Sequence, residues 1–295
     1  MTFPQIYFEL SSLDAILDLV TVVVPYTFNM DCVHEEEYPM AIRVSQITHS
    51  AVEKLLNDNS AVIHFSHSHG AGAVEGWSRF LSEPQERKDE FTIDAEGVGD
   101  PDDGYLCRHG VLRGDGIYDD YKEFFHHRYR LTPRLMHKGI SIDPHSAWLN
   151  HSLHQLHLQC ESTCRMIASA LDQRLPGYHF AERVAAPQAR TMSVLRLLSY
   201  DLQKARTRTL IGKGHTDKGF LTLHIVDERP GLLIRGEPQP YRARSNTALV
   251  FFGDKASHLT GGRFKPLYHE VIDTSANPAA SSRWSIIYFC HIMLD

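Results

Sequence analysis

Apolar positions recur at steps of three and four along SAWLNHSLHQLHLQCESTCRMIASALDQRLPG, residues 146–177. This spacing places them on one face of an α-helix and predicts a long helix that docks on a larger core. Ser146 is a plausible N-cap, and Pro176-Gly177 marks the end of the helix. The apolar face consists of Leu149, Leu153, Leu156, Cys160, Cys164, Ile167 and Leu171.

After Pro187 the pattern changes to short apolar segments separated by turn signals. The segments are TMSVLRLLSY, GFLTLHIV, GLLIRG, ALVFFGD, YHEVID and RWSIIYFC. The turn signals include Gly212, Pro230-Gly231, Pro238, Gly253 and Gly261-Gly262. Short strands spaced in this way predict an antiparallel sandwich or a jelly roll. Several are apolar on both faces, so we expect both faces to be covered.

No linker marks a boundary between domains, so we expect one domain. It comprises a mixed N-terminal region (1–145), the long helix (146–177) and a β-core (188–295) that carries the chemistry. The charged stretch 83–104, rich in Gly and Pro, predicts a surface loop.

Composition narrows the class of protein. The chain has 295 residues, 42% of them hydrophobic, and a net charge of −6, so nothing draws it to nucleic acid or to an anionic membrane. Its five cysteines are scattered and contain no C-x-x-C pair, which is typical of a reduced protein. The apolar stretch Ala15 to Tyr26 lacks a preceding basic residue and is too short to span a bilayer. We expect a cytoplasmic location.

His215 and Asp217 stand at the mouth of the apolar segment GFLTLHIV. Residues two apart on a strand point to the same side, and two such polar groups are costly inside a sheet unless something compensates them. A bound metal is one interpretation, and a surface strand end is the alternative. His269, at the start of another predicted strand, is the best third ligand. Two histidines and one carboxylate suit non-haem Fe(II) and leave positions open, whereas zinc more usually closes its shell.

Arg283 and Ser285 are also two apart, on the last predicted strand. An inward arginine is costly unless it meets an anion, and a guanidinium beside a hydroxyl suits a carboxylate. A structural ion pair is the alternative interpretation of Arg283.

The last hundred residues resemble the isopenicillin-N-synthase-like branch of the Fe(II)/2-oxoglutarate oxygenases. HTDKGFLTL is similar to the family's His-x-Asp strand, and RPGLLIRGE to its Pro-Gly-Leu strand. VFFGDKASHLTGGRFKPLYHEVI is similar to the stretch that ends at the distal histidine, and RWS to the Arg-x-Ser motif. VLRLLSYD resembles the strand whose tyrosine contacts 2-oxoglutarate, here Tyr200.

The resemblance implies a mainly β fold with helices: a double-stranded β-helix (jelly-roll) core, a helical N-terminal region and a long supporting helix. It implies Fe(II) held by His215, Asp217 and His269, with O2 and with 2-oxoglutarate as cosubstrate. The far carboxylate of 2-oxoglutarate would meet Arg283, Ser285 and Tyr200.

The chain departs from the family pattern at three places. Leu198 stands where the family often has asparagine, and Asp201 follows Tyr200 where proline is usual. The interval between His269 and Arg283 is long because DTSANPAASS intervenes, which predicts a lengthened hairpin loop.

Other histidines could also bind a metal, but we expect a structural or surface role for each of them. We place His258 in a turn, and His151, His154 and His157 on the exposed side of the long helix. We place His64, His67 and His69 in a loop after an edge strand. Cys160 and Cys164 are expected in the core.

The expected activity is oxidation of an unactivated C–H bond of a small molecule by hydroxylation, desaturation or cyclisation. The substrate is expected to be an amino acid derivative or a secondary metabolite, and neither nucleic acid nor a membrane is an expected partner. Three alternatives stay open: an oxidase of the isopenicillin N synthase type that uses O2 without 2-oxoglutarate, a non-catalytic metal-binding or sensor protein, and a zinc hydrolase. The sequence does not fix the product, the oligomeric state or the substrate-contacting residues.

Overall fold

The computed structural model describes residues 47–66, 68–93, 103–108, 121–129, 131, 144–205, 210–242, 244, 246–274 and 281–294. Its helices are α1 (His49–Asp58), α2 (Ser68–Leu81), α3 (Gln85–Glu90), α5 (Pro144–Arg174), α6 (Phe180–Ala185), α7 (Pro187–Met192) and α8 (Asp254–Leu259). Its strands are β1 (Ser60–His64), β2 (Thr92–Ile93), β3 (Asp103–Arg108), β4 (Lys122–His127), β5 (Val194–Asp201), β6 (Leu210–His215), β7 (Leu221–Asp227), β8 (Leu232–Ile234), β9 (Thr247–Phe252), β10 (His269–Ile272) and β11 (Ser282–Cys290).

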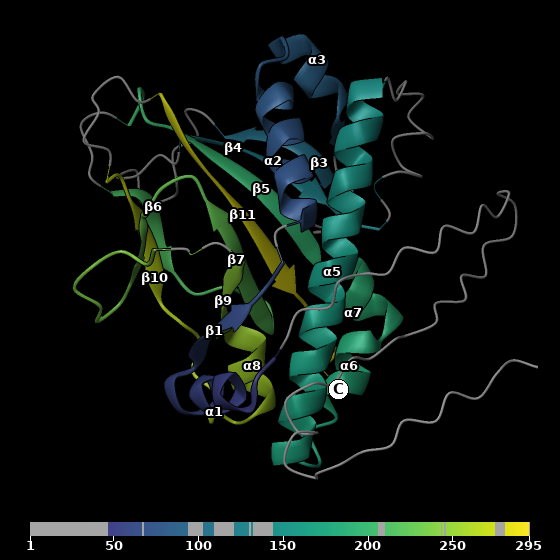
Figure 1. Ribbon diagram of the computed structural model, residues 1–295, viewed down its shortest axis with the longest axis vertical. Helices are drawn as coiled ribbons and strands as arrows, with labels where there is room; N and C mark the ends of the chain where they lie inside the picture. The colour runs from purple at the N-terminus through teal and green to yellow at the C-terminus, as the bar shows by residue number, and fades with distance from the viewer. Residues whose placement is uncertain are drawn as a thin grey trace, which may run out of the picture.

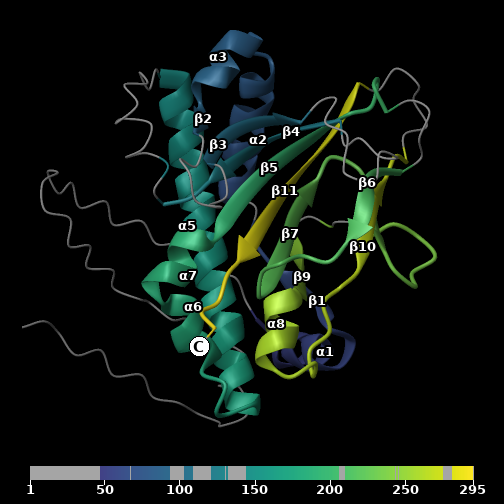
Figure 2. The same ribbon diagram turned by 180° about the vertical axis from the view of Figure 1, so that it is seen from behind.

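The described strands form two antiparallel sheets. An 8-stranded sheet has the order β1-β9-β7-β11-β5-β4-β3-β2, and a 3-stranded sheet has the order β6-β10-β8. In both views the large sheet lies between the long helix α5 on one side and the small sheet on the other (Figures 1 and 2). This is the expected jelly-roll core with a supporting helix.

Alternation along the central strand β11 explains the layers. Trp284, Ile286, Tyr288 and Cys290 pack into the large core that the sheet shares with α5. Ile287 faces the other way and packs with Tyr200 of β5, Ile211 of β6 and Val271 of β10. The face that carries Arg283, Ser285, Ile287 and Phe289 therefore looks into the space between the two sheets, which we call the barrel interior.

The apolar face of α5 is buried as expected from Leu153 to Leu171, and the side chain of Leu149 lies outside the described part. Leu153, Leu156, Cys160, Cys164 and Leu171 are each 0% exposed, so these cysteines are core residues. The helix begins at Pro144, before the expected N-cap, and ends at Arg174.

One expectation for α5 is wrong, because His157 is buried rather than exposed. Its ring packs against Tyr288 of β11, at 5.1 Å between ring centroids. The Nδ1 atoms of His157 and of His127 on β4 are 3.3 Å apart. Burial lowers the pKa of His157 to about 3, so the imidazole is neutral and behaves as part of the core.

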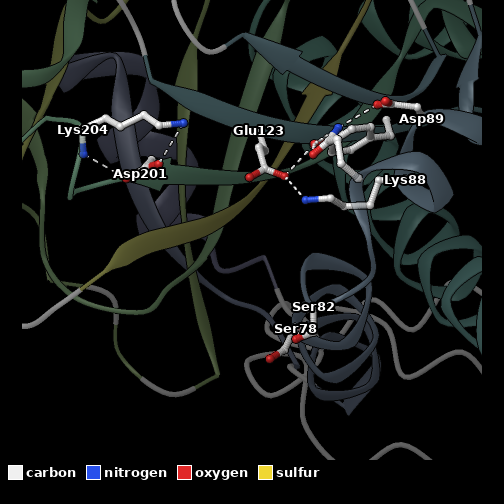
Figure 3. A network of polar contacts seen from close by, with 9 residues as sticks. Ser78, Ser82, Lys88, Asp89, Glu123, Asp201 and Lys204 are labelled. Carbon is white, nitrogen blue, oxygen red and sulfur yellow. Dashed lines mark hydrogen bonds and ion pairs between the residues drawn. The ribbon is translucent and has the colours of Figure 1, made fainter.

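The stretch 83–104 is not simply a loop, because it contains α3, β2 and the start of β3. Its charged residues hold these elements to the sheet. Lys88 of α3 donates to Glu123 of β4 at 2.8 Å, as Figure 3 shows, and Tyr105 of β3 donates to the same carboxylate at 2.6 Å. Charge in this stretch therefore marks a buried ion pair and not only a solvated surface.

The segment between β10 and β11 is not a hairpin, because the two strands belong to different sheets. β10 pairs with β6 and β8, whereas β11 pairs with β5 and β7. The long interval between His269 and Arg283 is thus a crossover between sheets, of which residues 275–280 lie outside the described part.

Within the described residues, no helix combines the length and the apolar character that crossing a membrane requires.

Candidate metal centre

His215, Asp217 and His269 converge at one end of the barrel. The cross-strand register sets His269, the first residue of β10, opposite His215, the last residue of β6. Nε2 of His215 lies 3.5 Å from Oδ1 of Asp217, and Nε2 of His269 lies 3.9 Å from the same oxygen. One ligand atom from each of the three residues falls within 4.8 Å of the others. Two nitrogens and one oxygen therefore face a common point.

Asp217 is not on a strand with His215, contrary to expectation. β6 ends at His215, and Asp217 lies in the connection that carries the chain from the small sheet to β7 of the large one. The backbone N–H of Asp254 donates to the carbonyl of Asp217 at 2.7 Å, and that of Lys255 to the carbonyl of Gly219 at 3.0 Å. The first residues of α8 thus hold this connection in place.

Gly253 allows that close approach. A Cβ at this position would lie 2.6 Å from the carbonyl oxygen of Asp217 and 2.5 Å from that of Gly219. Both neighbours are backbone atoms with little room to shift. The Gly-Asp pair 253–254 therefore has a structural reason: any side chain at Gly253 would displace the connection that carries Asp217.

Hydrogen bonds set the protonation of each candidate ligand. Nδ1 of His215 donates to the carbonyl of Lys213 at 2.8 Å, and Nδ1 of His269 to that of Leu267 at 3.0 Å. A carbonyl can only accept, so Nδ1 of each ring carries a proton, and Nε2 is the nitrogen that can present a lone pair to a metal. Thr222 donates to Oδ2 of Asp217 at 2.7 Å, which directs Oδ1 toward the histidines. Second partners of this kind are typical of metal ligands.

Exposure and charge differ among the three residues. The hydrogen bond with Asp217 raises the pKa of His215, whose side chain is 52% exposed. Burial on its own would raise the pKa of Asp217, but the bond from His215 and the charge of His269 outweigh it and lower that pKa. Burial lowers the pKa of His269, which keeps this ring neutral. A buried carboxylate between two imidazoles therefore favours the binding of a cation. Because His215 is half-exposed, the cation can reach the site from solvent.

Arg283 lies deep in the barrel, only 1% exposed. Its Nη2 donates to Oδ1 of Asp227 on β7 at 2.8 Å, so the ion pair that was the alternative interpretation does exist. Nε is buried and has no hydrogen-bond partner among the described residues. A guanidinium has five N–H donors, so one bond to Asp227 leaves donors for a second carboxylate.

The surroundings of Arg283 include the other two predicted anchors. Tyr200 stands directly opposite Arg283 in the β5–β11 register. A Cβ at Gly212 of β6 would lie 2.8 Å from its hydroxyl, so the tyrosine reaches across the interior toward the small sheet. Ser285 is 1% exposed and faces the same interior.

His224 and Asp227 complete this polar group and were not predicted. Nε2 of His224 lies 2.6 Å from Oδ2 of Asp227. Residues three apart on a regular strand point to opposite faces. A register shift in the β7–β11 pairing, between Ile286 and Ile287, brings both side chains to the interior.

Residues 191–292 match the family model described as the 2OG-Fe(II) oxygenase superfamily. These residues span β5 to β11 and include all three candidate ligands together with Arg283 and Ser285. The C-terminal part of this chain is thus similar to the 2OG-Fe(II) oxygenase superfamily.

Two curated relatives of this chain are fungal. Clavatol oxidase claD of Penicillium crustosum is 28% identical over 64% of this chain and 56% of its own length. The 2-oxoglutarate-dependent dioxygenase citB of Monascus ruber is 32% identical over 34% of this chain and 32% of its own. The chain thus spans about half the length of the first relative and about a third of the second.

A solved structure agrees on the fold. The dioxygenase for auxin oxidation 1 of Arabidopsis thaliana, in complex with 2-oxoglutarate, has a TM-score of 0.60 at 19% identity, over 83% of this chain and 88% of that one. The likeness shows that the two chains share the jelly-roll fold.

The rival histidines whose side chains the structure describes do not join the metal centre. His258 lies on α8 rather than in a turn. His64 and His69 are not in a loop as predicted: His64 ends the edge strand β1 and is exposed, and His69 lies on α2. His67 and the side chain of His69 lie outside the described part. Of the residues that sequence reasoning missed, Thr222 and His224 left a signal: each is a polar side chain inside the apolar run of β7.

Proposed function

We propose that the protein is an Fe(II)/2-oxoglutarate-dependent dioxygenase that oxidises an unactivated C–H bond of a small molecule. His215, Asp217 and His269 would hold Fe(II). The observation that supports this most is the convergence of two Nε2 lone pairs and one carboxylate oxygen within 4.8 Å. The donor set suits Fe(II) and leaves coordination positions for O2 and the cosubstrate.

The chain's own residues would orient the reactants and exclude water. Fe(II) and 2-oxoglutarate would supply the oxidising chemistry once bound. Thr222 keeps the Asp217 carboxylate turned toward the metal position. Arg283 would take the far carboxylate of 2-oxoglutarate, with Ser285 and Tyr200 beside it. Phe251 of β9 packs edge-on against the His269 ring, at 5.3 Å between centroids, and closes that side to solvent.

The substrate class follows from the relatives rather than from the pocket. The fungal relatives are named as an oxidase and a 2-oxoglutarate-dependent dioxygenase, which supports an oxidation of a small molecule. Within that class we propose a secondary metabolite or an amino acid derivative. Hydroxylation, desaturation and cyclisation all start from the same loss of a C–H hydrogen.

The ion pair of Arg283 with Asp227 favours a second candidate. An arginine that already has a carboxylate partner does not need one from 2-oxoglutarate. An oxidase of the isopenicillin N synthase type, which uses O2 alone, fits that observation. Stoichiometric succinate release during turnover separates the two candidates.

The deciding experiment is an anaerobic titration of the Fe(II)-loaded full chain with 2-oxoglutarate, followed by the visible charge-transfer band. We expect the band in the wild type, none in Asp217→Ala, and a much weaker affinity in Arg283→Ala. Arg174→Ala is the matched control, because Arg174 is an exposed arginine at the end of α5 that pairs with Glu53 of α1 at 3.0 Å. Iron binding without a band would overturn the 2-oxoglutarate proposal and favour the oxidase.

A further inference from the structure

His224 of β7 is a buried histidine to which the proposed function gives no role. Its side chain is 4% exposed. Leu223, Ile225 and Val226 all pack into the core shared with α5. Two consecutive residues on one face mark the bulge in this strand, and the bulge leaves His224 and Asp227 together in the barrel interior. Bulges redirect side chains in this way next to active sites.

Asp227 accepts one hydrogen bond from each of two neighbours. Nε2 of His224 lies 2.6 Å from Oδ2, and Nη2 of Arg283 lies 2.8 Å from Oδ1. A carboxylate can only accept, so Nε2 of His224 carries a proton and acts as the donor. The two oxygens of Asp227 therefore have different partners, and the contact between Asp227 and Arg283 is a single hydrogen bond.

The surroundings of Arg283 leave one end of its guanidinium for a ligand. A Cβ at Gly231, directly before β8, would lie 2.4 Å from Nε and 2.9 Å from the central carbon Cζ. The backbone thus covers the Nε edge, where no hydrogen-bond partner is found among the described residues. A carboxylate that binds Arg283 must therefore use the Nη end, and this is the end that Asp227 also contacts.

The orientation of Asp227 determines how much of the Nη end is open. A carboxylate and a guanidinium can pair through two parallel hydrogen bonds, which is their stronger arrangement. If both oxygens of Asp227 turned to Arg283, they would occupy the donors that a ligand needs. The bond from His224 holds Oδ2 and opposes that rotation. Tyr241 packs edge-on against the His224 ring, at 6.2 Å between centroids, and supports the imidazole in this position.

We propose that His224 is a positioning residue for the cosubstrate. It holds Asp227 to a single bond with Arg283 and thereby keeps the guanidinium open for the far carboxylate of 2-oxoglutarate. The inference rests on the proposed function, because it takes Arg283 as the cosubstrate anchor. It also explains how an arginine that is already in an ion pair can bind a second carboxylate.

The test measures the affinity of 2-oxoglutarate for the full chain loaded with Mn(II), by isothermal titration calorimetry. His224→Leu removes the donor, His224→Gln keeps an N–H donor, and Asp227→Asn removes the competing charge. The double variant His224→Leu/Asp227→Asn completes the cycle. His151→Leu is the matched control, because His151 is an exposed histidine on α5, which covers the other face of the large sheet (Figure 1).

We expect His224→Leu to weaken 2-oxoglutarate binding by about 10- to 100-fold, because Asp227 then replaces the ligand in a charge-assisted hydrogen bond. His224→Gln should restore most of the affinity, and His151→Leu should bind like the wild type. Asp227→Asn should bind 2-oxoglutarate at least as tightly as the wild type. In the Asp227→Asn background, His224→Leu should change the affinity by less than about 2-fold, since His224 acts through Asp227.

Three results would overturn the inference: an unchanged affinity in His224→Leu, an equal loss in both backgrounds, or weaker binding in Asp227→Asn alone. The affinity for Mn(II) shows whether each variant is folded, and the Asp227→Asn result decides even if His224→Leu does not fold. A wild type that binds Mn(II) but not 2-oxoglutarate would refute the proposed function and this inference together. A wild type that binds both, without the expected changes in the variants, would refute the inference alone.

Discussion

Replacing Asp227 by alanine would leave the charge of Arg283 without its partner in the interior. Both side chains are 1% exposed, so water cannot take over the role of the missing carboxylate. Removing one member of such a buried pair typically costs about 3–5 kcal/mol, because the other charge remains desolvated. His224 would lose its 2.6 Å partner as well. We expect the free energy of unfolding of Asp227→Ala to fall by about 3–5 kcal/mol.

The double variant Asp227→Ala/Arg283→Met tests the cause. Removing both charges together should cost less than the sum of the two single changes, by about 2 kcal/mol, because no unpaired charge is left. The measurement is urea unfolding followed by far-UV circular dichroism, with EDTA present so that metal does not contribute. Asp58→Ala is the control: its ion pair with Lys54 is half-exposed, and such pairs contribute roughly 0–1 kcal/mol. A loss below about 1 kcal/mol in Asp227→Ala, or strict additivity in the double variant, would refute the reasoning.

Three further predictions follow from contacts of single residues. Thr222→Val removes the hydroxyl that orients Asp217 and should weaken metal binding by about 10- to 100-fold in a competition titration, with the fold unchanged. Gly253→Ala should lower the free energy of unfolding by about 1–3 kcal/mol, because its Cβ meets two backbone carbonyls; an unchanged urea midpoint would contradict this. For His157, burial lowers the pKa from 6.5 to about 3. The unfolded chain therefore binds a proton below about pH 6.5 that the folded protein does not, and stability falls as the pH falls, by about 2 kcal/mol at pH 5. His157→Gln should remove that part of the acid sensitivity, as the difference between unfolding at pH 7 and at pH 5 would reveal.

The β-core could be predicted because period-two alternation and turn residues are local signals. The last strand, RWSIIYFC, shows this well: its alternation separates a helix-facing row from an interior row, and the structure has both. The long helix was equally readable from its apolar face. Its buried His157 was not, because periodicity sorts residues by polarity, and a neutral imidazole in the core looks like a surface residue.

The candidate ligands were found for a reason that is only partly correct. His215 and Asp217 do point to one place, yet they do so through a connection between sheets and not through the pleat of one strand. The pairing of sheets is set by contacts between distant segments, which no local pattern contains. The same limit hid the contact between His224 and Asp227, because a bulge changes the alternation of β7 without leaving a mark in its sequence.

The division of the barrel into a large and a small sheet has a consequence for the lifetime of the protein. The two candidate histidine ligands belong to the three-stranded sheet, and Asp217 lies on the connection that ties it to the rest. A metal bound here would link the three-stranded sheet to the rest of the barrel, and its binding free energy would add to the stability of the fold. Loss of the metal would then favour local unfolding of the three-stranded sheet, which would expose its backbone to proteases. The metal-free protein, which is inactive, would then also be degraded fastest. Metal occupancy would therefore determine both the activity and the abundance of the protein.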